Sequence, residues 1–229
     1  MIRSMHLGII FILLASIAAF SQDDSSRIQV FGGYSFLHAD LGGMNNVLLE
    51  TKLGAPINSF NMTRNFTDGR SAEAQYNFSG WVGVAFDVNG RYGALFTGLR
   101  GVTGIPKGSE YTFLAGPVLS YPNKSRVKPY VHALFGWDRP TLNASTITGV
   151  PTPIPASATT YSDVAYAIGG GADLRVNHRF SVRLGELDWF HTSLNLDKFY
   201  SSAFPQTLFE GLSTNERNWR VTTGVVVHF

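Results

Sequence analysis

Polar and apolar residues alternate along residues 217–229, and this pattern restricts the possible fold more than any other feature of the chain. Successive side chains of a β-strand point to opposite faces, so alternation predicts a strand with one apolar face. A helix would instead need apolar residues spaced three or four positions apart. The apolar face would hold Trp219, Val221, Val225, Val227 and Phe229, and the other face Arg220, Thr222, Gly224 and His228.

Similar alternation predicts seven earlier strands, so the fold class is all-β with eight strands in total. The connections after the second, fourth and sixth strands are short, whereas the other four are long. Short turns on one side and long loops on the other are typical of antiparallel up-and-down barrels in outer membranes. The earlier strands are expected at 27–38, 70–78, 81–92, 110–121, 126–138, 161–175 and 179–191. The long loops are expected at 39–69, 93–109, 139–160 and 192–216.

The dipeptide Asn89-Gly90 leaves one register open, because it is a strong hairpin signal. A turn there would place strands at 79–88 and 91–99 and would keep the total at eight. We favour a continuous strand over 81–92, because it keeps Asp87 and Arg91 on the same face as Asn89.

The composition predicts that the apolar faces point outward, unlike those of a soluble barrel such as a lipocalin. Charged residues make up only 15% of the chain, against about 25% in soluble domains. The polar faces are rich in Gly, Ala and Ser, which suits the narrow interior of an eight-stranded barrel. We therefore predict an eight-stranded antiparallel transmembrane β-barrel with aromatic girdles at both interfaces. The aromatic residues concerned are Tyr34, Phe36, Phe78, Tyr92, Tyr121, Trp137, Trp189 and Trp219.

The first residues have the pattern of a cleaved signal peptide. Residues 7–20 are apolar or small, and Ala19 and Ser21 precede Gln22 at positions suited to a cleavage site. This run is shorter than the ~20 residues of a membrane-spanning helix. We expect residues 1–21 to be removed on export, residues 22–229 to form the barrel domain, and the mature protein to reach the bacterial outer membrane. The chain has no cysteine, so neither a disulfide nor a lipid anchor is expected.

Several strand segments resemble the outer-membrane β-barrel family that includes outer membrane protein A-type barrels and opacity-type adhesins. The segments are FGGYSFL (31–37), AFDVNGRYG (85–93), YTFLAGP (111–117), VKPYVHALFG (127–136), IGGGADLRV (168–176), FSVRLGELDWF (180–190) and WRVTTGVVVHF (219–229). The resemblance covers most strands and none of the long loops. It implies a non-enzymatic barrel whose interior is packed with side chains, in which Trp219, Val221, Val225, Val227 and Phe229 form the insertion signal read by the barrel-assembly machinery.

The largest set of charged residues is expected to point into the barrel. Glu186 and Asp188 are out of phase with Arg183, but a bulge at Gly185 would shift them onto the inner face. We expect Asp173 to lie diagonally across from Arg183, with Gly169 and Gly171 leaving space for it. The set is interpreted as a structural plug, with an ion path as the alternative. Its members are Asp87, Arg91, His132, Asp173, Arg175, Arg183, Glu186, Asp188 and Arg220, with His228 near the end of the chain.

Other kinds of site receive little support. His191 and Ser193 resemble the His and Ser of outer-membrane lipid A deacylases, in which a Ser nucleophile needs a His within reach. The rest of that family's pattern is not recognisable. The histidines lack metal-ligand spacing, and residues 169–171 precede no helix that would make them a phosphate loop. No cofactor is expected. With a net charge of +2 and basic residues scattered singly, no nucleic-acid partner is expected either.

The leading hypothesis is therefore a structural or surface-interaction barrel whose long loops contact an extracellular ligand. A lipid-modifying enzyme using His191 and Ser193 and a narrow ion-conducting pore are the alternatives.

Overall fold

The computed structural model describes residues 27–40, 63–66, 68–94, 107–121, 125–142, 159–193 and 217–229. The predicted signal peptide, 1–21, and most of the predicted long loops lie outside the described residues. None of the described residues forms a helix with the length and apolarity needed to cross a bilayer.

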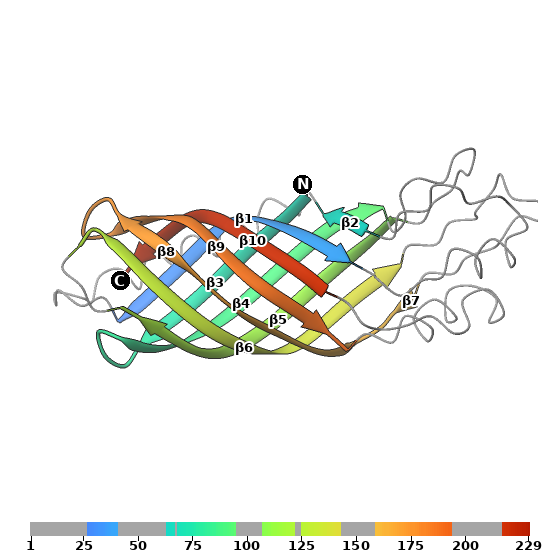
Figure 1. The fold of residues 1–229 in the computed structure, drawn as a ribbon, viewed down its shortest axis with the longest axis horizontal. Helices are drawn as coiled ribbons and strands as arrows, with labels where there is room; N and C mark the ends of the chain where they lie inside the picture. Colours follow the sequence, from blue (N-terminus) through green and yellow to red (C-terminus); the bar gives the residue numbers. More distant parts are fainter. Residues whose placement is uncertain are drawn as a thin grey trace, which may run out of the picture.

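Eight long strands form the wall, close to the positions that alternation predicts, and two short strands extend it (Figure 1). The short ones pair with the ends of β1 and β6. The bounds are β1 Ile28–Asp40, β2 Thr63–Phe66, β3 Asp68–Asn77, β4 Val82–Ala94, β5 Lys107–Ser120, β6 Val127–Leu142, β7 Thr159–Thr160, β8 Asp163–Arg175, β9 Phe180–Thr192 and β10 Arg217–His228.

The sheet closes on itself, because β10 pairs antiparallel with β1 from Gln29 opposite His228 to Asp40 opposite Arg217. Each of the other long strands pairs antiparallel with its neighbours, in the order β1, β3, β4, β5, β6, β8, β9, β10. Closure gives each of the eight long strands a hydrogen-bonding neighbour on both sides, which is what a sheet needs where no water can satisfy its edges. The predicted eight-stranded antiparallel barrel is thus confirmed.

The hairpin signal at Asn89-Gly90 does not turn the chain. Both residues lie inside β4, which pairs without interruption with β3 and β5, so the favoured register is correct. Gly90 has a packing role instead. A Cβ at Gly90 would lie 3.0 Å from the ring of Tyr111, whose hydroxyl contacts that of Tyr92.

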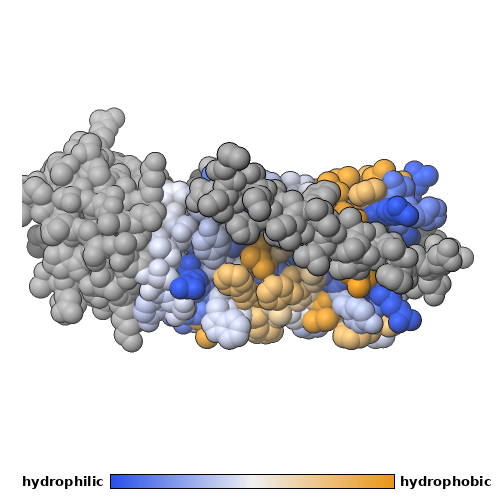
Figure 2. All heavy atoms as spheres, turned by 180° about the vertical axis from the view of Figure 1, so that it is seen from behind, coloured by the Kyte–Doolittle hydropathy of each residue, from blue (hydrophilic) through white to orange (hydrophobic). Residues whose placement is uncertain are grey.

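Large apolar side chains cover the outer wall, and Figure 2 shows them gathered over the strands. The wall exposes aliphatic and Phe side chains such as Phe86, Val131 and Val225, together with Tyr and Trp side chains. Of the eight predicted girdle residues, Phe36 is half-buried and the other seven are exposed. The inner face is largely polar, so the barrel is turned inside out relative to a soluble one.

Candidate functional site: the ion-pair network of the interior

A bulge in β9 sets the geometry of the interior. Ala172 lies opposite Gly185, while the next residue, Asp173, lies opposite Arg183. The same irregularity appears against β10, where Thr222 lies opposite Glu186 and Gly224 lies opposite Arg183. Two steps along β10 therefore match three steps along β9. One extra residue reverses the parity of a strand. Arg183 and Glu186 therefore both point inward, as expected for a bulge at Gly185.

Arg183 forms the centre of the first cluster. Its Nη2 lies 3.0 Å from Glu73 Oε1, its Nε 3.1 Å from Asp173 Oδ1, and its Nη1 2.8 Å from Glu186 Oε2. All four side chains are buried. Charge-assisted hydrogen bonds of this kind are stronger than neutral ones, and the guanidinium directs them in three directions at once. The cluster joins β3, β8 and β9 across the lumen.

Aromatic rings and hydroxyl groups enclose this first cluster. The guanidinium carbon of Arg183 lies 4.2 Å from the ring centroid of Phe31 and 4.8 Å from that of Tyr130. The hydroxyl of Tyr130 donates to Glu186 Oε2 at 2.5 Å, and Thr222 Oγ1 donates to Glu186 Oε1 at 2.9 Å. Both oxygens of Glu186 are thus bonded, and Arg183 is held by rings as well as by acids.

Arg220 forms the centre of a second cluster. Its Nη1 lies 2.7 Å from Asp87 Oδ1 and its Nε donates to Asp188 Oδ2 at 2.7 Å. His132 Nε2 lies 2.7 Å from the other oxygen of Asp188, and the side-chain amide of Asn89 donates to Asp87 Oδ1 at 2.6 Å. This cluster ties β4 and β6 to β9 and β10, so both clusters cross the barrel.

Two predicted members lie away from these clusters. Arg91 is fully buried nearer the long-loop end, where Nη1 lies 2.6 Å from Glu110 Oε1 and the guanidinium lies 5.2 Å from the ring centroid of Phe190. Arg175 is half-buried at the opposite end, where it lines a cavity together with His228. The structure therefore gathers seven of the nine predicted residues into the two clusters: Asp87, His132, Asp173, Arg183, Glu186, Asp188 and Arg220.

Gly169 and Gly171 were expected to leave space for Arg183, and this prediction is wrong. They lie opposite Asp188 and Glu186 and not opposite Arg183. A Cβ on Gly169 would overlap the carboxylate of Asp188, so the glycine makes room for an acid. The bulge moves the register by one residue, so Asp173 lies directly opposite Arg183 and not on the diagonal.

Glu73, Tyr130 and Thr222 belong to the network but were not singled out as members from the sequence. The parity signal was present for each, since each falls on the polar face of its predicted strand. What the sequence lacks is the distance information, because Glu73 lies 110 positions from Arg183.

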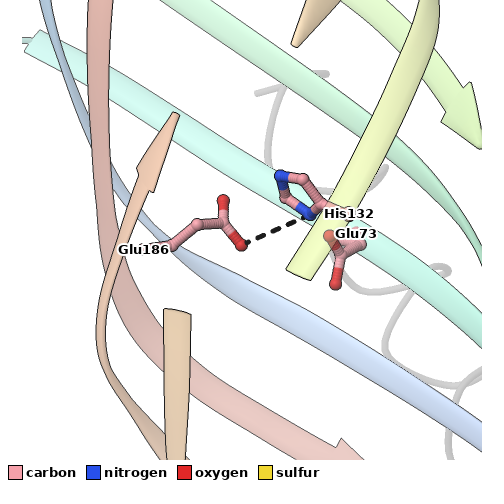
Figure 3. Close-up of side chains that lie close together, drawn as sticks. All are labelled: Glu73, His132 and Glu186. Atoms are coloured by element: carbon pink, nitrogen blue, oxygen red, sulfur yellow. Dashed lines mark ion pairs between the residues drawn. The ribbon is translucent and has the colours of Figure 1, made fainter. Parts of the chain in front are cut away.

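Glu73, His132 and Glu186 lie close enough together to suggest a metal site (Figure 3). One possible ligand atom from each lies within 4.8 Å of the others, and His132 Nδ1 is 4.0 Å from Glu186 Oε2. Arg183, however, already bonds both carboxylates, and a metal ion beside its guanidinium would be repelled. We therefore assign these side chains to the ion-pair network.

Comparison with known proteins supports the architecture. No protein-family model and no curated protein matches the chain. Among solved structures, Neisserial surface protein A aligns with a TM-score of 0.52 and 13% identity, over 89% of this chain and 98% of that one. The chain has the fold of a small outer-membrane barrel. Lower scores are found for Ail, the attachment invasion locus protein of Yersinia pestis (0.48, 14% identity, 88% and 97% covered), and for the outer membrane protein OprG of Pseudomonas aeruginosa (0.46, 11% identity, 88% and 95% covered).

His191 and Ser193 lie on the outside of this outer-membrane-type barrel, apart from the ion-pair network. The ring of His191 packs against that of Tyr166, with centroids 4.9 Å apart. Ser193 Oγ lies 2.9 Å from the carbonyl oxygen of Val164 and 3.3 Å from Asp163 Oδ1, both of which accept its proton. These acceptors direct the hydroxyl proton toward β8.

The predicted insertion signal forms part of the seam of the barrel. Trp219, Val221 and Val225 are exposed on the outer wall, while Val227 and Phe229 are half-buried. The backbone N–H of Phe229 donates to the carbonyl oxygen of Ile28 at 2.9 Å, so the last residue continues the pairing with β1.

Proposed function

We propose that the protein is an integral barrel of the bacterial outer membrane that anchors surface-exposed loops and has no catalytic role. The closed wall with an apolar outer face carries this proposal. Soluble monomers rarely expose a contiguous apolar patch larger than a few hundred Å², whereas this apolar surface extends around the wall. In a bilayer the same surface contacts lipid, without the free-energy cost of exposing apolar groups to water. The apolar run before Gln22 supports export through a cleaved signal peptide, 1–21.

The loops are proposed to be the functional surface. The chain leaves β1, β4, β6 and β9 at the same end of the barrel, and long segments follow each of these strands. Outer-membrane barrels place their long loops outside the cell. We propose that these segments contact an extracellular ligand.

The interior is proposed to be a structural plug. Buried guanidinium groups at Arg183 and Arg220 link strands from opposite sides of the lumen. The interior of an eight-stranded barrel is only wide enough for its side chains to fill it. A barrel of this kind should not conduct ions in a planar bilayer.

No catalytic role is proposed for His191 and Ser193. A serine nucleophile transfers its proton to a base, whereas the hydroxyl of Ser193 is directed to a backbone carbonyl and a carboxylate on β8. Lipid A deacylase activity of the purified protein, lost in Ser193→Ala, would contradict this view.

Single-cysteine labelling tests the proposed orientation, because the natural chain has no cysteine to interfere. Ser145→Cys places the thiol in a long connection, and Gly80→Cys places it in a short turn, where an added Cβ meets no neighbouring atom. A membrane-impermeant maleimide should label intact cells carrying Ser145→Cys and should label Gly80→Cys only after the outer membrane is opened. The reverse pattern would overturn the orientation.

A further inference from the structure

Positive charge collects at the short-turn end of the barrel, although its carriers are scattered in the sequence. We call the described residues at this end the rim: 27–29, 77–82, 119–121, 125–128, 173–181 and 227–229. Asp173 is the one acidic side chain among these residues. The cationic side chains of the rim are Arg27, Arg126, Lys128, Arg175 and Arg179.

Three of these cations, Arg27, Lys128 and Arg175, face the opening. Side chains two positions apart share a face of a strand. Lys128 in β6 and Arg175 in β8 therefore point the same way as buried Tyr130 and Asp173. Arg27 lines the same opening, so three positive charges lie at the mouth of the lumen.

Backbone hydrogen bonds fix the residues that carry these charges. The carbonyl oxygen of Arg27 accepts from the N–H of Asn77 at 2.7 Å, and that of Arg126 accepts from the N–H of Arg175 at 2.7 Å. The carbonyl oxygen of Arg179 accepts from His228 at 2.8 Å. The backbone positions of the residues that carry the charges are therefore set by the wall of the barrel.

A cavity of about 290 Å³ opens at this mouth. Its lining includes Arg27, Lys128 and Arg175, together with the polar side chains of Gln75 and Ser181. Asp173 also lines it, and its carboxylate accepts from Arg183 at 3.1 Å. Three cationic side chains against one carboxylate leave the lining with an excess of positive charge. Its volume lies near the lower end of the range for small-molecule sites, about 300–1,000 Å³.

We propose that this mouth cavity binds an oxyanion, a phosphate or carboxylate group of a ligand that approaches along the barrel axis from the short-turn side. Guanidinium and ammonium groups form charge-assisted hydrogen bonds to such groups. The carboxylates of Glu73 and Glu186, deeper in the lumen, repel an anion and confine it to the mouth. Because Arg27, Lys128 and Arg175 line the mouth cavity, a soluble ligand reaches them more directly than a lipid headgroup in the surrounding leaflet.

Titration of the refolded full-length barrel in a non-ionic detergent tests the proposal, with inorganic pyrophosphate as the probe at low salt. The variant Lys128→Gln/Arg175→Gln removes two charges from the cavity. The control Arg70→Gln/Arg139→Gln removes two exposed charges outside the rim. The cavity variant should bind pyrophosphate at least about tenfold more weakly, since a hydrogen bond to a charged group contributes about 1.5–3 kcal/mol. The control should bind as the unmodified barrel does.

Two results would overturn the site: no binding to the unmodified barrel, or equal weakening in both variants, which would show a general effect of net charge. If the double variant does not refold, Arg175→Gln alone provides the comparison. Titration in nanodiscs distinguishes the sources of the oxyanion. Equal affinity in phosphatidylcholine and phosphatidylglycerol discs indicates a soluble ligand. Binding that is weaker in phosphatidylglycerol, and stays weaker at a salt concentration that screens the surface potential, shows that the headgroup competes for the site.

Discussion

Replacement of Arg183 by Leu should strongly destabilise the barrel. The side chain is 2% exposed, and its removal leaves Glu73, Asp173 and Glu186 buried without their shared cation. Removal of one partner from a buried ion pair typically costs about 3–5 kcal/mol, because the remaining charge cannot recover its hydration. We expect Arg183→Leu to lower the free energy of unfolding by that order.

Urea unfolding in phospholipid vesicles, followed by tryptophan fluorescence, measures this change. Arg139→Gln removes an exposed charge and should stay within about 0.5 kcal/mol of the natural protein. If unpaired acids cause the loss, adding Glu186→Gln to Arg183→Leu should recover part of it, and the double-mutant cycle should give a coupling energy of about 0.5–3 kcal/mol. A loss below about 1 kcal/mol, or no coupling, would refute the reasoning. A stable Arg183→Leu variant that conducts ions would show that Arg183 is a gate and not part of a plug.

Three further predictions concern the wall and the two ends of the chain. Val225→Arg should make the free energy of folding into vesicles less favourable by about 2–4 kcal/mol, because Val225 is 47% exposed on the outer wall. Thr222→Ser changes a fully buried lumen residue and should cost far less. Similar small losses for both variants would contradict the assignment of faces. Deletion of Phe229 should lower the amount of barrel in the outer membrane of cells without changing refolding in detergent, and an unchanged cellular level would remove the insertion signal. Mass spectrometry of the protein from outer membranes should find Gln22 at or near its N-terminus, and retention of residues 1–20 would exclude the cleavage.

The sequence predicts the wall well because the side-chain period of a strand is local. Along β10, for example, the exposed and buried residues follow the predicted parity from Trp219 to Val226. The bulge could also be predicted, because Gly185 separates two sets of charged residues whose parities conflict. These inferences need only neighbouring residues and one physical rule.

Contacts between distant strands could not be predicted. Glu73 joins Arg183 only because closure of the barrel brings β3 opposite β9. The clustering of basic residues at the rim could not be predicted for the same reason, since they come from three separated segments of the chain. The strand ends were also missed: β6 continues through Pro140, which lies opposite Glu110 in β5. Local composition predicts a loop there, whereas pairing with a neighbouring strand keeps the segment extended.

Quenching of tryptophan fluorescence by brominated lipids tests the central claim, an apolar wall in contact with the bilayer, and needs no substitution. The chain has four tryptophans, and Trp81, Trp137, Trp189 and Trp219 are all exposed on the outside of the barrel. Vesicles of lipid brominated along the acyl chains should quench most of the emission of the folded protein relative to vesicles of the unmodified lipid. Equal emission in the two kinds of vesicle would show that the tryptophans do not face lipid, and the assignment of the apolar face to the membrane would be wrong.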